Sequence, residues 1–435
     1  MCKVKSLLIV LFIANHFNHA TTENYEKQFT YEEGKVKEFI AGETKSFLDK
    51  LNKEREEKSK DLITIDQIRN DLEVNEKNQI LIDILNNFST TLQAQNKQRR
   101  EKIGYIEIDK KKYCYQITIE SEKGIMFTSD THADADTVEK IWYFFDQLKQ
   151  NNEVDKLVFL GDYGDRGDYW TYTYFLLAAM AAKYGKDILF IRGNHEDINT
   201  MYNNGGMYAF EAIKKNKECA NNCWDEMPLI CDITWKQKKI FCSHGAMPLN
   251  KNGEWLDYEG KTELLKDPFF LANWNENIFI NDPPSGIEKS FRGAGYEIPI
   301  KEIFQNMVNN EYDWSIHGHI HKNQCGILTT EKQPKQVITV VANEFYYNNN
   351  LKTPFLPAVY ILNNDNPNGT FFNLLQKEND KIKNFYKEYP TNVEVLNNCV
   401  IYKYTFQIIK KINKEKKIDC NILKTICCCC DICEK

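Results

Sequence analysis

The segment KLVFLGDYGDR, at Lys156–Arg166, decides the fold of this chain. Its apolar run Leu157–Leu160 is typical of a buried central strand, and a glycine-containing turn follows it directly. The turn carries two carboxylates and one guanidinium, which belong to Asp162, Asp165 and Arg166. Open α/β sheets place their chemistry where strands end in such turns, so the segment predicts a functional site at a sheet edge. Because surface loops also carry Asp and Arg, this interpretation depends on related segments elsewhere in the chain.

Related segments lie on both sides of this one. Gly124–Ser129 is a predicted strand that runs into Asp130 and His132, and an amphipathic helix is predicted at Thr137–Lys149. After a second, apolar helix, a strand that ends at Ile191 leads into an Asn-His pair. This β-α-β-α-β order implies parallel strands with right-handed crossovers and with the ligand-type residues at their carboxyl ends.

The strands that follow form a second, more antiparallel set. A hairpin predicted within residues 229–242 leads to His244, and the strand Tyr312–Ile316 leads into the sequence His-Gly-His-Ile-His at residues 317–321. A further hairpin at Ala358–Phe372 closes the domain. We therefore place a central α/β domain at residues 103–375.

Two flanks enclose this domain. Residues 21–102 are charged and carry apolar residues at loose helical spacing, which predicts a helical N-terminal extension of two or three helices. These helices would flank the central domain or form an arm that docks a partner. Residues 376–435 are rich in Lys and Asn, end in a cysteine-rich tail and are expected to be peripheral.

Residues 1–20 are typical of a secretory signal peptide. Two lysines supply positive charge, Leu7–Ala14 is a short apolar core, and Ala20 could precede a cleavage site. The core is too short to cross a bilayer, and no other stretch is long and apolar enough for a transmembrane span. The sequons at Asn87 and Asn368 agree with a luminal or secreted protein. A buried N-terminal segment is the alternative.

The 14 cysteines favour two different locations. Cys219, Cys223 and Cys231 could hold a disulfide in an oxidising compartment, whereas Cys242 is predicted to be a buried, inert thiol. Six more lie at residues 420, 427–430 and 433. In the cytosol such a run would indicate palmitoylation and a membrane-tethered protein; in the lumen it would indicate cross-linking. The leader favours the luminal location.

Six of the eight histidines fall in four short segments, each after or inside an apolar run. Together with the acids and the amide at the strand ends, they form a set of candidate metal ligands: Asp130, His132, Asp162, Asn194, His244, His319 and His321. Such ligands suit Mn, Fe or Zn, and the absence of cysteine among them argues against a structural zinc site. Seven candidates are too many for one ion, so we expect two divalent metal ions that share a carboxylate in a hydrolytic centre.

Five motifs built from these residues occur in order along the chain. They are Asp130-Thr-His132, Gly161-Asp162 with Asp165-Arg166-Gly167, Gly193-Asn194-His195-Glu196, His244-Gly245 and Gly318-His319. In this order and spacing they resemble the calcineurin-like metallophosphoesterase superfamily. The Asp-Arg-Gly of the second motif resembles the phosphoprotein phosphatase branch, the serine/threonine phosphatases. The resemblance covers about residues 124–373 and implies a sandwich of two mixed β-sheets flanked by helices.

The resemblance also implies roles for the matching residues. The metal ligands would be divided into Asp130 and His132 for the first ion, Asp162 for both ions, and Asn194, His244 and His319 for the second. Arg166 and Arg292 would grip phosphate oxygens, because a planar guanidinium matches phosphate bidentately. His195, held by Asp165, would protonate the leaving alkoxide, while a water activated by both ions attacks phosphorus.

The chain departs from the family pattern in several places. The first motif usually reads Gly-Asp-x-His-Gly, but Ser129 and Ala133 replace its glycines, so the loop could differ. His321 matches the Gly-His-x-His of other metallophosphoesterases, in which it would bind the first ion; a solvent-facing side chain is the alternative. His317 is expected in the outer shell or the core, and Tyr346 is a candidate substrate neighbour.

We therefore expect a metal-dependent phosphomonoester hydrolase, a protein serine/threonine phosphatase that uses a two-metal-activated water. A phosphoesterase for a small molecule such as a nucleotide is the alternative that His321, the first motif and the leader favour. A catalytically inactive phosphate-binding protein is a third, against which the complete ligand set argues. The expected partner is a phosphoprotein or a small phosphoester, and a net charge of −6 argues against binding of a nucleic-acid polymer.

Overall fold

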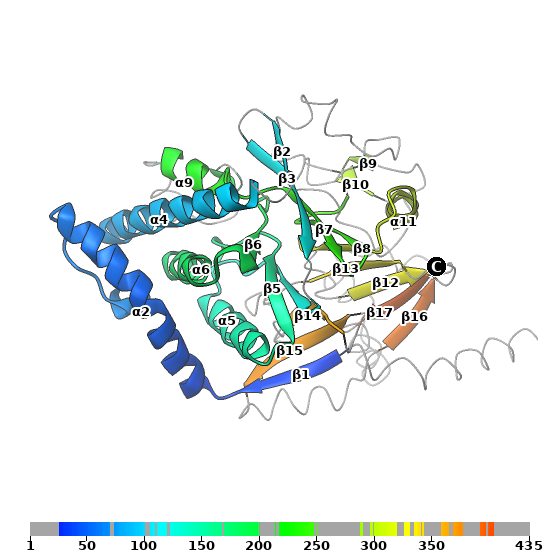
Figure 1. Ribbon diagram of the computed structural model, residues 1–435, viewed down its shortest axis with the longest axis horizontal. Coiled ribbons are helices and arrows are strands. Elements are labelled where there is room, and N and C mark those ends of the chain that lie inside the picture. Colours follow the sequence, from blue (N-terminus) through cyan, green and yellow to red (C-terminus); the bar gives the residue numbers. More distant parts are fainter. Residues whose placement is uncertain are drawn as a thin grey trace, which may run out of the picture.

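A computed structural model of the chain contains two β-sheets with helices outside them (Figure 1). The structure describes residues 26–69, 74–100, 105–108, 111–119, 122–167, 169–198, 200, 214, 217–247, 249, 288–289, 296–298, 300–319, 326–330, 335–340, 342, 358–364, 369–376, 392–396 and 399–403. Both large sheets contain parallel and antiparallel pairs. The predicted fold class, an α/β sandwich of two mixed sheets flanked by helices, is therefore confirmed.

The first sheet has the strand order β1-β15-β14-β4-β5-β6. Its strands are β1 (Glu26–Tyr31), β4 (Gly124–Thr128), β5 (Val154–Phe159), β6 (Ile188–Phe190), β14 (Ala358–Leu362) and β15 (Thr370–Gln376). As predicted, β4, β5 and β6 run parallel. On β5, Leu157 and Phe159 face the helices whereas Val158 faces the second sheet. Because both faces are buried, the strand needs an unbroken apolar run.

The second sheet has the strand order β16-β17-β12-β13-β11-β8-β7-β3-β2. Its strands are β2 (Tyr105–Ile108), β3 (Lys111–Ile119), β7 (Ile230–Trp235), β8 (Lys238–Ser243), β11 (Trp314–His317), β12 (Gly326–Thr330), β13 (Gln336–Thr339), β16 (Asn392–Leu396) and β17 (Cys399–Lys403). Strands β8 and β11 are parallel neighbours, so the histidines that follow them emerge side by side. The strands β9 (Glu288–Lys289) and β10 (Tyr296–Glu297) form a separate small sheet.

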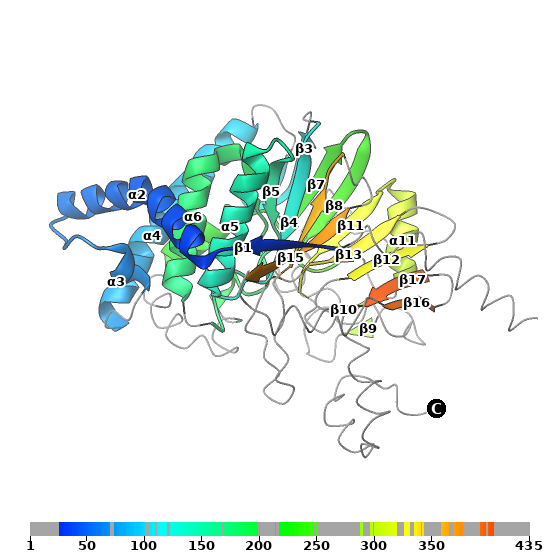
Figure 2. The same cartoon turned by 90° about the horizontal axis from the view of Figure 1, so that it is seen from below.

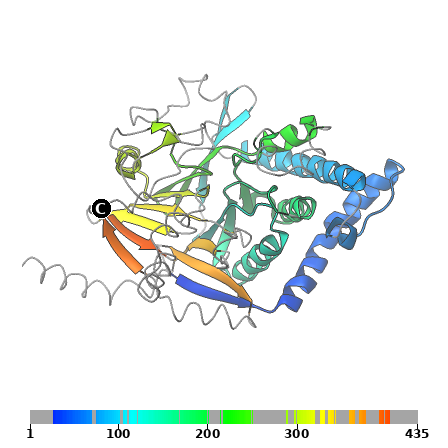
Figure 3. The same ribbon diagram turned by 180° about the vertical axis from the view of Figure 1, so that it is seen from behind.

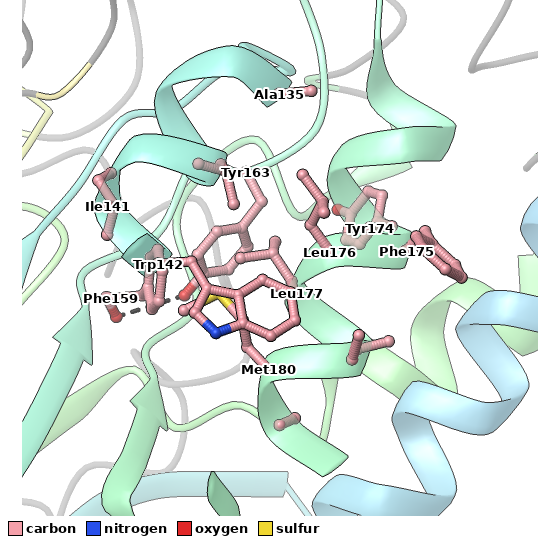
Figure 4. Packing of buried hydrophobic residues seen from close by; sticks show 14 of the residues in the cluster. Ala135, Ile141, Trp142, Phe159, Tyr163, Tyr174, Phe175, Leu176, Leu177 and Met180 are labelled. Atoms are coloured by element: carbon pink, nitrogen blue, oxygen red, sulfur yellow. Dashed lines mark hydrogen bonds between the residues drawn. The ribbon is translucent and has the colours of Figure 1, made fainter. Parts of the chain in front are cut away.

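Two helices cover the outer face of the first sheet, and α11 (Ile300–Asn309) lies outside the second (Figure 2). Helix α5 (Ala135–Gln150) begins after Asp134, whose side chain accepts a hydrogen bond from the Thr137 backbone and caps the helix. Helix α6 (Trp170–Tyr184) is apolar almost all round and is buried along most of its length. Side chains of both helices pack with Phe159 at the end of β5 and with Tyr163 in the loop after it (Figure 4).

The N-terminal extension is helical over most of its length, as predicted. Its helices are α2 (Glu33–Glu57), α3 (Ile65–Arg69) and α4 (Val74–Arg100), and they lie outside α5 and α6 (Figure 3). The apolar face of α4 is fully buried, and its Phe88 meets Phe190 of β6 with ring centroids 5.1 Å apart. These helices therefore flank the central domain and share its core.

Several elements were not predicted. Strand β1 pairs in parallel with β15, so the extension also contributes a strand to the first sheet. The hairpin β16–β17 joins the second sheet beside β12, although its residues read as peripheral. Helix α9 (Lys217–Trp224) carries Cys219 and Cys223. No disulfide joins Cys219, Cys223 and Cys231 among the described residues, so the predicted disulfide is not found there; Cys242 is the predicted buried thiol.

The predictions about location concern residues that the structure describes only in part. The Asn87 sequon lies on α4, where the buried side-chain amide donates hydrogen bonds to Glu54 and to the Asp83 carbonyl. No helix in the described part of the chain has both the length and the apolar character needed to span a membrane. The leader, Asn368, Tyr346 and the cysteine-rich tail lie outside the described residues.

Candidate metal centre

The predicted ligands come from five strands that end at the same edge of the sandwich. In chain order they are Asp130 and His132 after β4, Asp162 after β5, Asn194 after β6, His244 after β8 and His319 after β11. Each of these six residues has an exposed fraction of 7% or less. His321, the seventh candidate, and Arg292 lie outside the described residues.

One group of ligand atoms gathers on the β4 side of Asp162. The Asp162 Oδ2 atom lies 3.5 Å from His132 Nε2 and 3.8 Å from His195 Nε2. His132 Nε2 in turn lies 3.8 Å from Asp130 Oδ1. His132, Asp162 and His195 each offer one ligand atom within 4.8 Å of the others, a spacing that could hold an ion. His195, which was predicted to be an acid and not a ligand, thus belongs to this group of possible ligands.

A second group gathers on the other side of the same carboxylate. The Asp162 Oδ2 atom lies 3.0 Å from His244 Nε2. Asn194 Oδ1 lies 3.0 Å from both His244 Nε2 and His319 Nδ1, and these two nitrogens are 3.2 Å apart. Asp162, His244 and His319 form the second group that could hold an ion. Asp162 is therefore shared between the two groups.

The donor set fits cations. Asp162 Oδ1 accepts a hydrogen bond from the His195 backbone N–H at 3.0 Å, but Oδ2 is buried and accepts none of good geometry from the described residues. His244 Nδ1 lies 2.8 Å from the Leu160 carbonyl oxygen. Because a carbonyl only accepts, His244 Nδ1 carries a hydrogen, and its Nε2 faces Asp162 as a ligand atom. Carboxylate, imidazole and amide ligands of this kind suit Mn, Fe or Zn.

The electrostatic environment also favours positive charge. Burial disfavours a charged His244, yet the carboxylates of Asp162 and Asp130 raise the pKa of His244 to about 9. Burial would raise the pKa of Asp162, but His244 and His195 hold it well below its usual range. Burial and the Arg166 guanidinium lower the pKa of His132 to about 4, so its imidazole is neutral at pH 7. A divalent ion bound at Asp162 would displace the proton from His244.

Left-handed backbone recurs at the strand ends. The φ angle is 53° at Asp130, 44° at His132, 59° at Asp162 and 64° at His319. Such angles are uncommon for residues other than glycine and tend to gather at functional sites. At Ala133, where the resembled family has glycine, φ is 60°, a backbone conformation that favours glycine.

Asp165 connects two histidines of the site. Its Oδ1 lies 3.0 Å from His132 Nδ1, and its Oδ2 makes a short hydrogen bond with His195 Nδ1. Burial raises the pKa of Asp165, but His195 and His132 together lower it to about 2, so the carboxylate is ionised. Arg166 Nη2 lies 2.7 Å from His195 Nε2. Because a guanidinium only donates, His195 Nε2 accepts this bond and Nδ1 carries the hydrogen.

Two further buried residues complete the site. His317 is fully buried, as predicted, and burial lowers its pKa to about 3. Glu196, for which no role was predicted, is fully buried and accepts backbone N–H bonds from Asp162, Tyr163 and Gly193. Its only signal in the sequence was its place beside His195, because bonds to the backbone of other loops leave no pattern in side chains.

Comparison with known proteins identifies the same segment. Residues 124–323 match the family model of the calcineurin-like phosphoesterases. The chain is 29% identical over 182 residues to serine/threonine-protein phosphatase BSL2 of Arabidopsis thaliana, a match that covers 37% of this chain and 17% of that protein. It is 28% identical over 175 residues to a serine/threonine-protein phosphatase of Caenorhabditis elegans, with 37% and 36% covered. The chain thus spans well under half the length of these relatives.

Solved structures are similar to this chain at low sequence identity. A protein serine/threonine phosphatase from Saccharomyces cerevisiae, described as similar to human phosphatase PP5, is 15% identical with a TM-score of 0.44 over 69% of this chain and 90% of that one. A metallophosphoesterase from Sphaerobacter thermophilus is 13% identical with a TM-score of 0.33 over 62% and 94%. The family match and the curated relatives confirm the resemblance read from the five motifs.

Proposed function

Since residues 124–323 match the family model of the calcineurin-like phosphoesterases, we propose that this protein is a metal-dependent phosphomonoester hydrolase that acts on phosphoserine or phosphothreonine in proteins. The observation that carries the proposal is the position of Asp162. Its Oδ2 lies 3.5 Å from His132 Nε2 on one side and 3.0 Å from His244 Nε2 on the other. A carboxylate between two sets of imidazoles is the arrangement that a two-metal centre requires.

Each ion would be held by residues of this chain. Asp130 and His132 would hold the first, and Asn194, His244 and His319 the second, with Asp162 common to both. When bound, the two ions supply Lewis acidity and an activated water for attack on phosphorus. The Leu160 carbonyl orients His244, and Asp165 orients His132, so that each ring keeps a ligand nitrogen toward Asp162. His321 remains a candidate for the first ion.

The remaining residues would bind and protonate the substrate. The Arg166 guanidinium lies beside both His132 Nε2 and His195 Nε2, at 3.4 and 2.7 Å, and would grip phosphate oxygens at this point. His195 is held through Nδ1 by the ionised Asp165. Once Arg166 has turned to the phosphate, His195 Nε2 is free to take up a proton from water and would deliver it to the leaving alkoxide. Arg292 is proposed as a second phosphate ligand.

A second candidate function is hydrolysis of a small phosphoester such as a nucleotide. The observation that favours it is the sequence Gly318-His319-Ile320-His321 after β11, which matches metallophosphoesterases outside the protein phosphatases. The curated relatives at 28–29% identity favour a protein substrate instead.

The test is an activity panel on the metal-reconstituted protein. Purified chain is loaded with Mn²⁺, Fe²⁺ or Zn²⁺ and assayed on a phosphoserine peptide, a phosphothreonine peptide, a nucleotide, a phosphodiester and p-nitrophenyl phosphate. Two bound ions per chain and the highest kcat/KM on phosphopeptides would support the proposal. Higher kcat/KM on nucleotides would replace it with the second candidate. Bound metal without turnover of any phosphoester would identify a binding protein.

A further inference from the structure

We propose that Glu196 is a positioning residue for the metal centre. Its carboxylate joins the loop after β5 to the loop after β6, and it thereby fixes the backbone that carries the bridging Asp162. Glu196 has no exposed surface, so it cannot touch a substrate and must act through its neighbours. The catalytic consequence rests on the proposed function, whereas the effect on metal binding does not.

Three backbone N–H groups from two loops converge on this carboxylate. Glu196 Oε2 accepts hydrogen bonds from the N–H of Asp162 at 2.9 Å and of Gly193 at 2.8 Å. Glu196 Oε1 accepts a hydrogen bond from the N–H of Tyr163 at 2.9 Å. An ionised carboxylate offers about four lone-pair sites and no donor, so it suits a pocket that presents only N–H groups. The bonds connect β5 to β6 where the strands have already ended.

The two loops approach each other closely beside this carboxylate. A Cβ atom built on Gly193 would lie 2.2 Å from Asp162 Oδ1 and 2.4 Å from the Asp162 backbone nitrogen. A Cβ atom on Gly161 would lie 2.6 Å from the Gly193 backbone. The N–H groups of Asp162 and Gly193 therefore meet in a space with no room for a side chain at either glycine, and Glu196 reaches it from its own loop.

The two loops exchange hydrogen bonds, and this exchange decides which oxygen of Asp162 is available to bind a metal ion. Glu196 accepts from the Asp162 N–H, while Asp162 Oδ1 accepts from the His195 N–H at 3.0 Å. With Oδ1 engaged, Oδ2 is the oxygen that faces His132 and His244. Glu196 thus holds the Asp162 backbone, with its left-handed φ of 59°, in the conformation that directs Oδ2 between the two ligand groups.

The substitution Glu196→Gln tests the role of the carboxylate at constant size. The glutamine oxygen could still accept two N–H groups, but its NH₂ group would face the third N–H as donor against donor. The matched control is Glu139→Gln on α5, another buried glutamate, which accepts a hydrogen bond from Tyr172 of α6. Both variants replace one buried carboxyl group with an amide, and only the first touches the two loops.

The measurement is Mn²⁺ affinity by calorimetry, and circular dichroism determines the fraction of folded protein in each sample. We expect Glu196→Gln to weaken Mn²⁺ binding by roughly 10–100-fold, the range typical of groups that orient metal ligands. Glu139→Gln should lower the thermal midpoint and keep Mn²⁺ affinity within about twofold of wild type, because it touches no residue of the two loops. Wild-type affinity in Glu196→Gln, or an equal loss in Glu139→Gln, would overturn the proposal.

Amide hydrogen exchange keeps the proposal testable if the variant does not fold. In the wild-type protein the amides of Asp162, Tyr163 and Gly193 should exchange slowly, because each donates to Glu196 and not to solvent. Rapid exchange of these amides would overturn the contact itself. A wild-type protein that binds Mn²⁺ but hydrolyses no phosphoester would remove the proposed function and leave the affinity result for Glu196 intact.

Discussion

At the scale of single residues, Asp162 is constrained by its backbone conformation and through both of its carboxylate oxygens. Its backbone is left-handed, its Oδ1 is engaged by the His195 N–H, and its Oδ2 lies among imidazole nitrogens. We predict that Asp162→Asn loses metal and lowers kcat by more than about 100-fold, the upper end of the loss seen for groups that only orient ligands. Metal content by mass spectrometry and turnover of p-nitrophenyl phosphate check this. Two retained ions with near wild-type turnover would show that Asp162 does not bridge.

His195 offers a test that separates acid catalysis from metal binding. We predict that His195→Asn lowers kcat on phosphoserine by roughly 10²–10⁴-fold, because serine alkoxide needs a proton to leave. The loss on p-nitrophenyl phosphate should be smaller, because nitrophenolate leaves unprotonated. Asp165→Asn should show the same dependence on leaving group, since Asp165 orients His195 through Nδ1. Loss of an ion in His195→Asn would make His195 a ligand, whereas equal losses on both substrates with both ions retained would give it a structural role.

At the scale of secondary structure, α4 decides whether the N-terminal extension is part of the fold. We predict that Phe88→Ala destabilises the protein by roughly 3–5 kcal/mol, because Phe88 is fully buried against Phe190 of β6. The control is Gln93→Ala on an exposed turn of the same helix, which should change stability by less than about 0.5 kcal/mol. Urea unfolding measures both. Similar stabilities for the two variants would make α4 an appended arm.

Asp187 joins three elements at the opposite end of β5 and β6 and gives a prediction about pH. Burial would raise its pKa, but hydrogen bonds from Lys149 and Lys156 lower it. A lowered folded-state pKa stabilises the protein above the unfolded-state pKa, and this contribution is lost as pH falls through the folded-state value. We therefore expect Asp187→Asn to cost roughly 1 kcal/mol at pH 7 and progressively less below about pH 4. A constant difference from pH 7 to pH 3 would contradict the assignment.

The elements also show what sequence can and cannot predict. Strand β5 was predictable because apolar residues on both faces are followed at once by polar ligands. Strand β1 was not, because EKQFTY carries no strong strand pattern and takes its conformation from β15. Helix α9 was not predicted, because its cysteines were interpreted as candidates for a disulfide. In the site, the metal ligands were predictable from their residue types and spacing. Glu196 was not, because it binds backbone groups of another loop, and the sequence alone does not show that the two loops are close together.

At the scale of the whole molecule, the luminal or secreted location stays a prediction that depends on the leader, residues 1–20. We expect the mature protein to begin after Ala20 and to carry a glycan at Asn368 but none at Asn87, whose amide is buried and hydrogen-bonded. Mass spectrometry of protein from its natural source decides this. An intact N-terminus together with acylated Cys427–Cys430 would place the protein at a cytoplasmic membrane surface instead.

The pairing of β1 with β15 also sets an order of events during synthesis. Glu26 lies opposite Phe371, 345 residues further along the chain. A ribosome that adds about 5–20 residues per second reaches the second strand roughly 20–70 seconds after the first. Through this interval β15, the strand with which β1 pairs in the folded sheet, has not yet been made. The first described strand to be made is therefore among the last to join its sheet.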